Sequence, residues 1–140
     1  MSVTYAAGHL RAVFPSRPTQ RSVPGDIGGE TFTVYIALVH DPHPLEAACE
    51  EVSSAIPSDE YQATLRAAVS GLEGSSGLTV TDQQATTFRG HPARSASLSS
   101  ASGVDYSLLA FFWTSHRFYL LFGATGSDFT TLMTSFEALP

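Results

Sequence analysis

The sequence predicts an α+β domain in which two main helices pack on an antiparallel β-sheet of about six to eight strands. Three observations predict this class. The 140 residues fit one domain, 1–140, and a chain of this length buries roughly 68–70% of the surface that its unfolded form exposes. Several segments alternate apolar and polar residues with a period of two, which is typical of strands. Two others carry an apolar stripe at helical spacing.

The first third of the chain predicts strands. Residues 9–15 form a short strand that ends at Pro15, and residues 19–23 have room for one edge strand. Pro24-Gly25-Asp26 and Gly28-Gly29 are expected to break regular structure. Residues 30–40 alternate well and predict a strand, with one face made of Phe32, Val34, Ile36 and Leu38 and the other of Thr31, Thr33, Tyr35 and Ala37.

Residues 45–56 fit two structures. Apolar residues at i, i+3, i+4, i+7 and i+11 form a helical stripe, made of Leu45, Ala48, Cys49, Val52 and Ile56. The alternation expected of a strand is weaker. The local pattern favours a helix, whereas the family resemblance given below favours a strand before Pro57.

Two helices are predicted with caps. Residues 58–72 begin with Ser58 as the cap, and Asp59 and Glu60 suit the positive end of the helix dipole. Residues 73–77 are expected to close this helix with a loop. Residues 127–139 predict the second helix, with Ser127 as its cap. The expected buried faces consist of Tyr61, Leu65, Ala68, Val69 and Leu72 in the first helix, and of Phe129, Leu132, Met133 and Phe136 in the second.

Four further strands are expected at 78–86, 92–100, 104–114 and 117–125, with a hairpin tip at 114–117. The last two strands are apolar on both faces, so both faces need cover. Their apolar runs are far shorter than the roughly 20 residues of a membrane-spanning helix. We therefore expect a buried central hairpin with no membrane span.

Composition limits the classes of partner. The net charge is −6, every basic residue is arginine, and the nearest approach to a basic cluster is Arg11, Arg17 and Arg21. Nucleic-acid binding needs a basic surface that neutralises phosphates, so we expect none. The absence of lysine and asparagine suggests a bacterial, GC-rich genome. The N-terminus lacks a signal-peptide pattern, which predicts a cytoplasmic chain as written, or an extracytoplasmic one if a leader has been removed. Composition leaves the oligomeric state open.

Three motifs together carry a family resemblance. "FRGHPARSASL" contains a Gly-x-Pro-(Gly/Ala)-Arg element at 90–94, and an Arg-x-Tyr-x-Leu strand follows at 117–121. The closing "FTTLMTSFEALP" has a Phe-x-x-Leu helix. This chain resembles the PsbP-like fold, shared by the photosystem II protein PsbP, bacterial DcrB, actinobacterial LpqN-type lipoproteins and a eukaryotic Ran-release factor.

The resemblance implies an antiparallel sheet between helices and a role without catalysis. We therefore expect a protein-interaction domain, such as an adaptor, assembly factor or chaperone-like protein, with another protein as partner and no cofactor. The alternative is a small-molecule or metal-binding domain of the cell envelope. The resemblance supplies no catalytic residues.

Two turns offer candidate residues for binding a partner or ligand. "HDPHP" places His40, Asp41 and His43 after a strand. These are metal-ligand types, but no second cluster completes a four-ligand site, so we expect no metal. "RGHP" places Arg89 and His91 in the inter-strand turn, and loops often carry function.

No arrangement of residues predicts catalysis. Ser115 and His116 are neighbours at a hairpin tip, and the sequence has no Gly-x-Ser-x-Gly elbow and no phosphate-binding glycine loop. Glu50 and Glu51 follow Cys49 and are expected to disfavour its thiolate through like charge. We therefore expect no enzyme.

Overall fold

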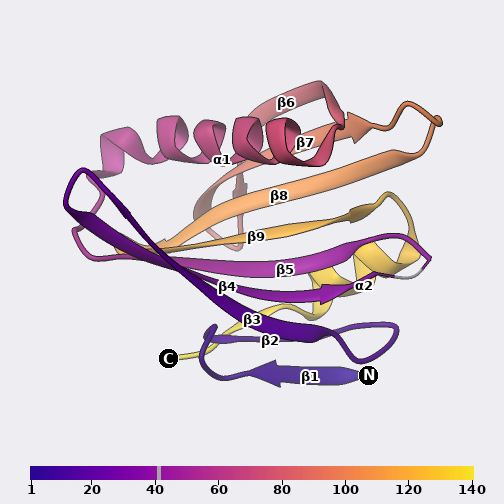
Figure 1. Ribbon diagram of the computed structural model, residues 1–140, viewed down its shortest axis with the longest axis horizontal. Coiled ribbons are helices and arrows are strands. Elements are labelled where there is room, and N and C mark those ends of the chain that lie inside the picture. Colours follow the sequence, from indigo (N-terminus) through magenta and orange to yellow (C-terminus); the bar gives the residue numbers. More distant parts are fainter. Residues whose placement is uncertain (41) are drawn as a thin grey trace.

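A computed structural model describes residues 1–40 and 42–140, which form two antiparallel sheets and two α-helices (Figure 1). The seven-stranded sheet has the order β3-β4-β5-β9-β8-β7-β6. Its strands are β3 (Thr19–Ile27), β4 (Glu30–Val39), β5 (Leu45–Val52), β6 (Thr79–Phe88), β7 (His91–Ser99), β8 (Asp105–Thr114) and β9 (Arg117–Ala124). The small sheet joins β1 (Ser2–Tyr5), β2 (Leu10–Val13) and β10 (Glu137–Ala138). The helices are α1 (Tyr61–Ser76) and α2 (Ser127–Ser135).

The two helices cover opposite faces of the large sheet. On β8, Leu108 packs in one cluster with Val69 of α1, whereas Leu109 packs in another with Phe129 of α2. Figure 1 shows α1 running beside β7 and β8, with both chain termini on the side of β1 and β2. The predicted α+β class is confirmed, and the central β8–β9 hairpin is buried on both faces as expected.

The ambiguous segment is a strand. β5 pairs with β4 along its whole length and with β9 from Leu45 to Glu51, so main-chain hydrogen bonds on both edges hold it extended. Ala47 and Cys49 are buried on the α2 side, while Ala48 lies on the α1 side. The helical stripe in its sequence results from small and apolar residues on both faces of a central strand.

The edge strand β3 is longer than predicted, because the expected break at Pro24-Gly25-Asp26 was wrong. Pro24 is tolerated in β3, since an edge strand has one row of main-chain groups without a partner strand. Gly25 is paired with Phe32, and a Cβ there would lie 2.2 Å from the ring atom Cζ. The glycine therefore makes room for the phenylalanine ring, and the turn comes at Gly28 and Gly29, where φ is positive.

The bounds of the first helix differ from the prediction. Ser58–Glu60 form a 3₁₀ turn, and Ser58 makes no capping hydrogen bond with its side chain. The α-helix begins at Tyr61 and continues through the predicted closing loop to Ser76. Gly77 ends it with a left-handed backbone at φ 74°.

The second helix is shorter than the predicted 127–139. It ends at Ser135, and Phe136 is extended, with φ −56° and ψ 134°. Ser127 is its first helical residue rather than its cap. The next two residues pair with β2 as β10, so strand pairing replaces the expected last helical turn.

Candidate functional site

The two turns that the sequence singled out lie at opposite ends of the large sheet. His40 and His43 lie between β4 and β5, where Leu45 is paired with Gly123 near the end of β9. Arg89 and His91 lie at the β6–β7 turn, close to the pairing of Ala93 with Phe111 near the other end of the sheet. The predicted residues therefore do not form one site. Asp41 falls outside the residues that the structure describes.

The histidines of these turns have different surroundings. His40 and His43 are exposed, and the His43 ring meets Tyr106 edge-on at 6.3 Å. His91 is half-buried and stacks on Trp113, with ring centres 3.9 Å apart. Within 1–40 and 42–140, no group of three or more His, Cys, Asp or Glu side chains is placed to hold a metal ion.

Arg89 binds the protein's own chain. Its guanidinium donates hydrogen bonds to the carbonyls of Met133, Thr134 and Phe136 at the end of α2. It also lies 4.7 Å from the ring centre of Phe88. A cation at a helix C-terminus stabilises the helix dipole, so these contacts give Arg89 a structural role.

The candidate nucleophiles lack the surroundings that activate them. Ser115 Oγ lies 3.4 Å from Nδ1 of His116 on an exposed tip, longer than the usual distance between nucleophile and base. Cys49 is fully buried, and burial, reinforced by the charge of Glu51, raises the pKa of its thiol to about 12. The expected disfavoured thiolate is confirmed, with burial as its main cause.

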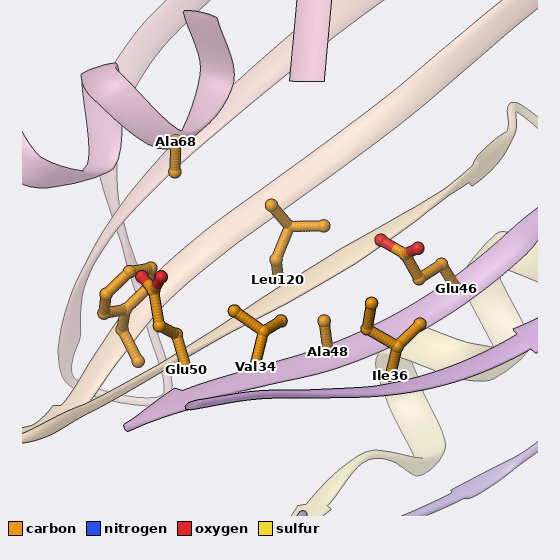
Figure 2. Close-up of a pocket in the computed structure, with 8 residues that line it drawn as sticks. Val34, Ile36, Glu46, Ala48, Glu50, Ala68 and Leu120 are labelled. Carbon is orange, nitrogen blue, oxygen red and sulfur yellow. The ribbon is translucent and has the colours of Figure 1, made fainter. Parts of the chain in front are cut away.

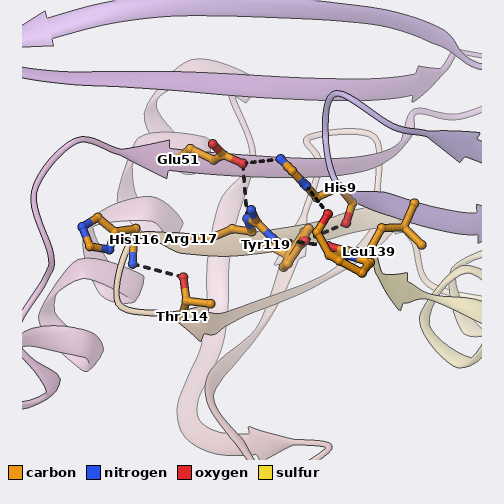
Figure 3. Close-up of polar contacts among 8 residues, drawn as sticks. His9, Glu51, Thr114, His116, Arg117, Tyr119 and Leu139 are labelled. Carbon is orange, nitrogen blue, oxygen red and sulfur yellow. Dashed lines mark hydrogen bonds and ion pairs between the residues drawn. The ribbon is translucent and has the colours of Figure 1, made fainter.

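A polar cluster ties the chain end to the sheet (Figure 3). Glu51 Oε1 lies 2.9 Å from His9 Nε2 and 3.2 Å from Arg117 Nε. Tyr119 donates a hydrogen bond of 2.7 Å to the carbonyl of His9, and Arg117 donates one to the carbonyl of Leu139. These contacts join the β1–β2 turn, β5, β9 and the C-terminal segment, so the role of this cluster is structural.

The best candidate site is an apolar surface on the α1 side of β4 and β5 and of the adjoining Leu120 on β9, which we call the open strip. Its floor consists of Phe32, Val34, Ile36, Ala48, Val52 and Leu120, and Glu46 and Glu50 of β5 flank it. Figure 2 shows the two carboxylates rising from β5 on either side of the apolar floor, with Ala68 of α1 above. Val34, Ile36 and Leu120 are only half-buried, so the strip presents apolar atoms to solvent.

Two hollows follow the open strip. One of about 190 Å³ lies over Val34, Ile36 and Ala48, beside Ala68 of α1. The other, of about 480 Å³, extends past Val52 to the segment that leads into α1. Glu50 lines both, so the two hollows are neighbours along β5 on the side of the sheet that carries α1.

The electrostatics of the strip are acidic. Burial raises the pKa of Glu46, and Arg21 on β3 partly offsets this shift. Burial also raises the pKa of Glu50. Glu30 and Glu60 line the larger hollow as well. An apolar floor with partly desolvated carboxylates suits a ligand that is apolar along its length and positively charged at intervals.

Comparison with known proteins identifies the fold of this chain. No protein-family model matches the chain, and no curated protein matches it. Among solved structures, the chain is similar to the solution structure of cyanobacterial PsbP (CyanoP) from Synechocystis sp. PCC 6803. The TM-score is 0.55 and the identity 12%, over 99% of this chain and 91% of that chain. This protein therefore has a PsbP-like α+β fold, as the sequence motifs indicated.

Neither helix of the described chain is both long and apolar enough to cross a membrane.

Proposed function

We propose that this chain is a non-catalytic protein-interaction domain and that the open strip is its contact surface. The observation that carries the proposal is the unequal cover of the large sheet. The α2 side of β4 and β5 packs into a buried core, whereas the α1 side leaves half-buried apolar residues beside two hollows. An exposed apolar patch with a polar rim is typical of an interaction site.

Two further observations support a role in binding. The PsbP-like fold is not a known enzyme fold, and PsbP-like proteins interact with other proteins. The serine, histidine and cysteine considered above lack the arrangement of an activated nucleophile. A small-molecule ligand is the second candidate, since the larger hollow of about 480 Å³ has the size of a ligand pocket.

The test compares the wild-type protein with a variant of the strip. Val34→Thr with Ile36→Thr keeps β-branched side chains, so the strand persists while the floor becomes polar. Gln84→Thr with Thr86→Ser on the exposed edge strand β6 is the matched control. Each tagged protein is isolated from its native host, crosslinked and examined by native mass spectrometry.

The proposal expects one stoichiometric protein partner, crosslinked next to β4 or β5 and lost only in the strip variant. If both variants retain the partner equally, the contact surface lies outside the open strip. A bound small mass without a partner protein would favour the ligand-binding alternative.

A further inference from the structure

The open strip has room for one helix beside α1. On the α1 side, α1 packs on β6, β7 and β8, while α2 packs on the opposite face. This leaves β3, β4 and β5, which are neighbours at one edge of the sheet. Three strands spaced about 4.8 Å apart make a surface roughly 14 Å wide. A helix with its side chains is about 10 Å across, so one helix fits.

The side of α1 that faces the strip permits close approach. Thr64 and Ala68 of α1 line the hollows four residues apart, which puts them on one side of the helix, and Glu60 lies just before α1 beside the larger hollow. Thr64 and Ala68 are small, so a second helix can pack against this edge at the usual interaxial distance of about 8–10 Å.

The strip carries charges at a defined spacing. Glu46 and Glu50 are four residues apart on one strand, so both point to the same face, about 13 Å apart along it. On a helix, residues seven or eight apart lie two turns apart, about 10–12 Å along the axis. Lysine and arginine side chains are long enough to make up the difference.

We propose that the open strip binds an amphipathic helix of another protein, which carries an apolar stripe and two basic residues two turns apart that pair with Glu46 and Glu50. This inference rests on the proposed function and specifies its partner. The apolar stripe covers Val34, Ile36 and Leu120. The two basic groups restore the charge interactions that the carboxylates lose when the helix displaces water.

A second copy of this chain fits the strip less well. In a symmetric pair, the strip of one copy meets the same strip of the other. Glu30, Glu46, Glu50 and Glu60 would then face an equal set of carboxylates, with Arg21 the cation beside Glu46. Charge repulsion therefore favours a basic partner over self-association.

Synthetic helices test the inference directly. Two 20-residue peptides with capped ends share a Leu/Ala stripe and differ at two positions, seven residues apart, that carry lysine in one and glutamine in the other. Binding to the full chain is measured by fluorescence anisotropy in 50 mM and 500 mM salt. Glu46→Gln with Glu50→Gln removes the proposed charges, and Asp82→Asn with Asp105→Asn changes net charge equally at exposed sites.

The lysine peptide is expected to bind at least about 10-fold more tightly than the glutamine peptide in low salt, because two partly desolvated charge pairs form. The double glutamine variant should abolish this preference, the double asparagine variant should keep it, and high salt should reduce it.

Four results would overturn the inference. If both peptides bind equally and Val34→Thr with Ile36→Thr weakens both, the strip binds helices without charge selection, and the proposed function stands. If neither peptide binds, the inference fails, while the open strip as contact surface is still decided by loss of the native partner in the strip variant. If the strip variant binds both peptides as the wild type does, the peptides bind elsewhere and the inference fails as well. If sedimentation shows a dimer that the strip variant dissociates, the occupant is a second copy.

Discussion

Substitution of Arg89, which the sequence predicted as a candidate binding residue, tests whether this side chain acts in binding a partner or in stabilising the fold. The substitution Arg89→Ala removes three hydrogen bonds to carbonyls at the end of α2 and the contact over Phe88. Hydrogen bonds from a charged donor contribute about 1.5–3 kcal/mol where buried, and Arg89 is exposed. We therefore expect the free energy of unfolding to fall by about 2 kcal/mol for the whole set of contacts.

A companion variant separates contacts from backbone strain. Arg89 has φ 51°, a left-handed backbone that costs a residue with a Cβ about 1 kcal/mol. Arg89→Ala keeps that strain, whereas Arg89→Gly relieves it, so the glycine variant should lose only about 1 kcal/mol. Arg66→Ala, at an exposed position on α1, is the control and should change stability by less than about 0.5 kcal/mol.

The assay is urea unfolding followed by two probes. Far-ultraviolet circular dichroism reports the whole fold, and fluorescence of Trp113, the single tryptophan, reports the region where His91 stacks. If Arg89→Ala were as stable as Arg66→Ala and lost the native partner, the reasoning would be refuted, and Arg89 would be a binding residue as the sequence suggested.

Three other substitutions test the surroundings of a single side chain or glycine. Glu50→Gln should raise the Tm at pH 7 and leave it unchanged at pH 3. Burial raises the pKa of the Glu50 carboxyl in the folded chain, so the free energy of unfolding falls as pH rises above about 4.5 and the carboxyl ionises, and glutamine avoids this loss. Equal Tm gains at both pH values would contradict this reasoning. Tyr119→Phe should cost about 1 kcal/mol in urea unfolding, because the carbonyl of His9 keeps a second main-chain donor; a loss above about 3 kcal/mol would show that carbonyl left unpaired. Gly123→Ala should cost about 1–3 kcal/mol, since its Cβ would lie 2.5 Å from Leu45 Cδ1 in a buried site; a neutral result would mean that Leu45 moves freely.

The elements that the sequence predicted best are those whose pattern has one physical solution. The β8–β9 hairpin is apolar on both faces over short runs, and only a central buried strand satisfies that pattern. The helix stripe through Leu65 and Val69 is equally direct, and both side chains are fully buried. The PsbP-like fold followed from motifs at 90–94, at 117–121 and in the closing segment, of which only the second lies in the β8–β9 hairpin.

The elements that were wrong depend on distant partners. Pro24 and Gly25 break most strands, but here the edge position tolerates the proline and the ring of Phe32 lies over the glycine. Phe136 continues the apolar stripe of α2, yet β2 captures the next two residues as β10. Ser2–Tyr5 were not predicted as a strand, and their order comes from pairing with β2. The local sequence of a segment does not predict which distant strand it pairs with.

The candidate site was missed for a related reason. The alternation of Phe32, Val34 and Ile36 predicted only that these side chains share one face, because local pattern does not show which half of a sheet a helix covers. Residue type alone drew attention to the histidines and Arg89 in the turns. A signal did exist in β5: once the segment is a strand, Glu46 and Glu50 fall on the same face as Ala48, which places two carboxylates on an apolar surface.

The carboxylates of Glu46 and Glu50 connect the stability of the free chain with the proposed function. Burial raises the pKa of both, so at neutral pH each ionised group lowers the stability of the free chain. Neutral residues in their places would give a more stable sheet, and the half-covered floor of Val34 and Ile36 also leaves apolar area in water. A basic amphipathic helix would relieve both costs at once, because it covers the floor and pairs the charges. The features that weaken the isolated domain are thus the same ones that a partner of this chemistry would use.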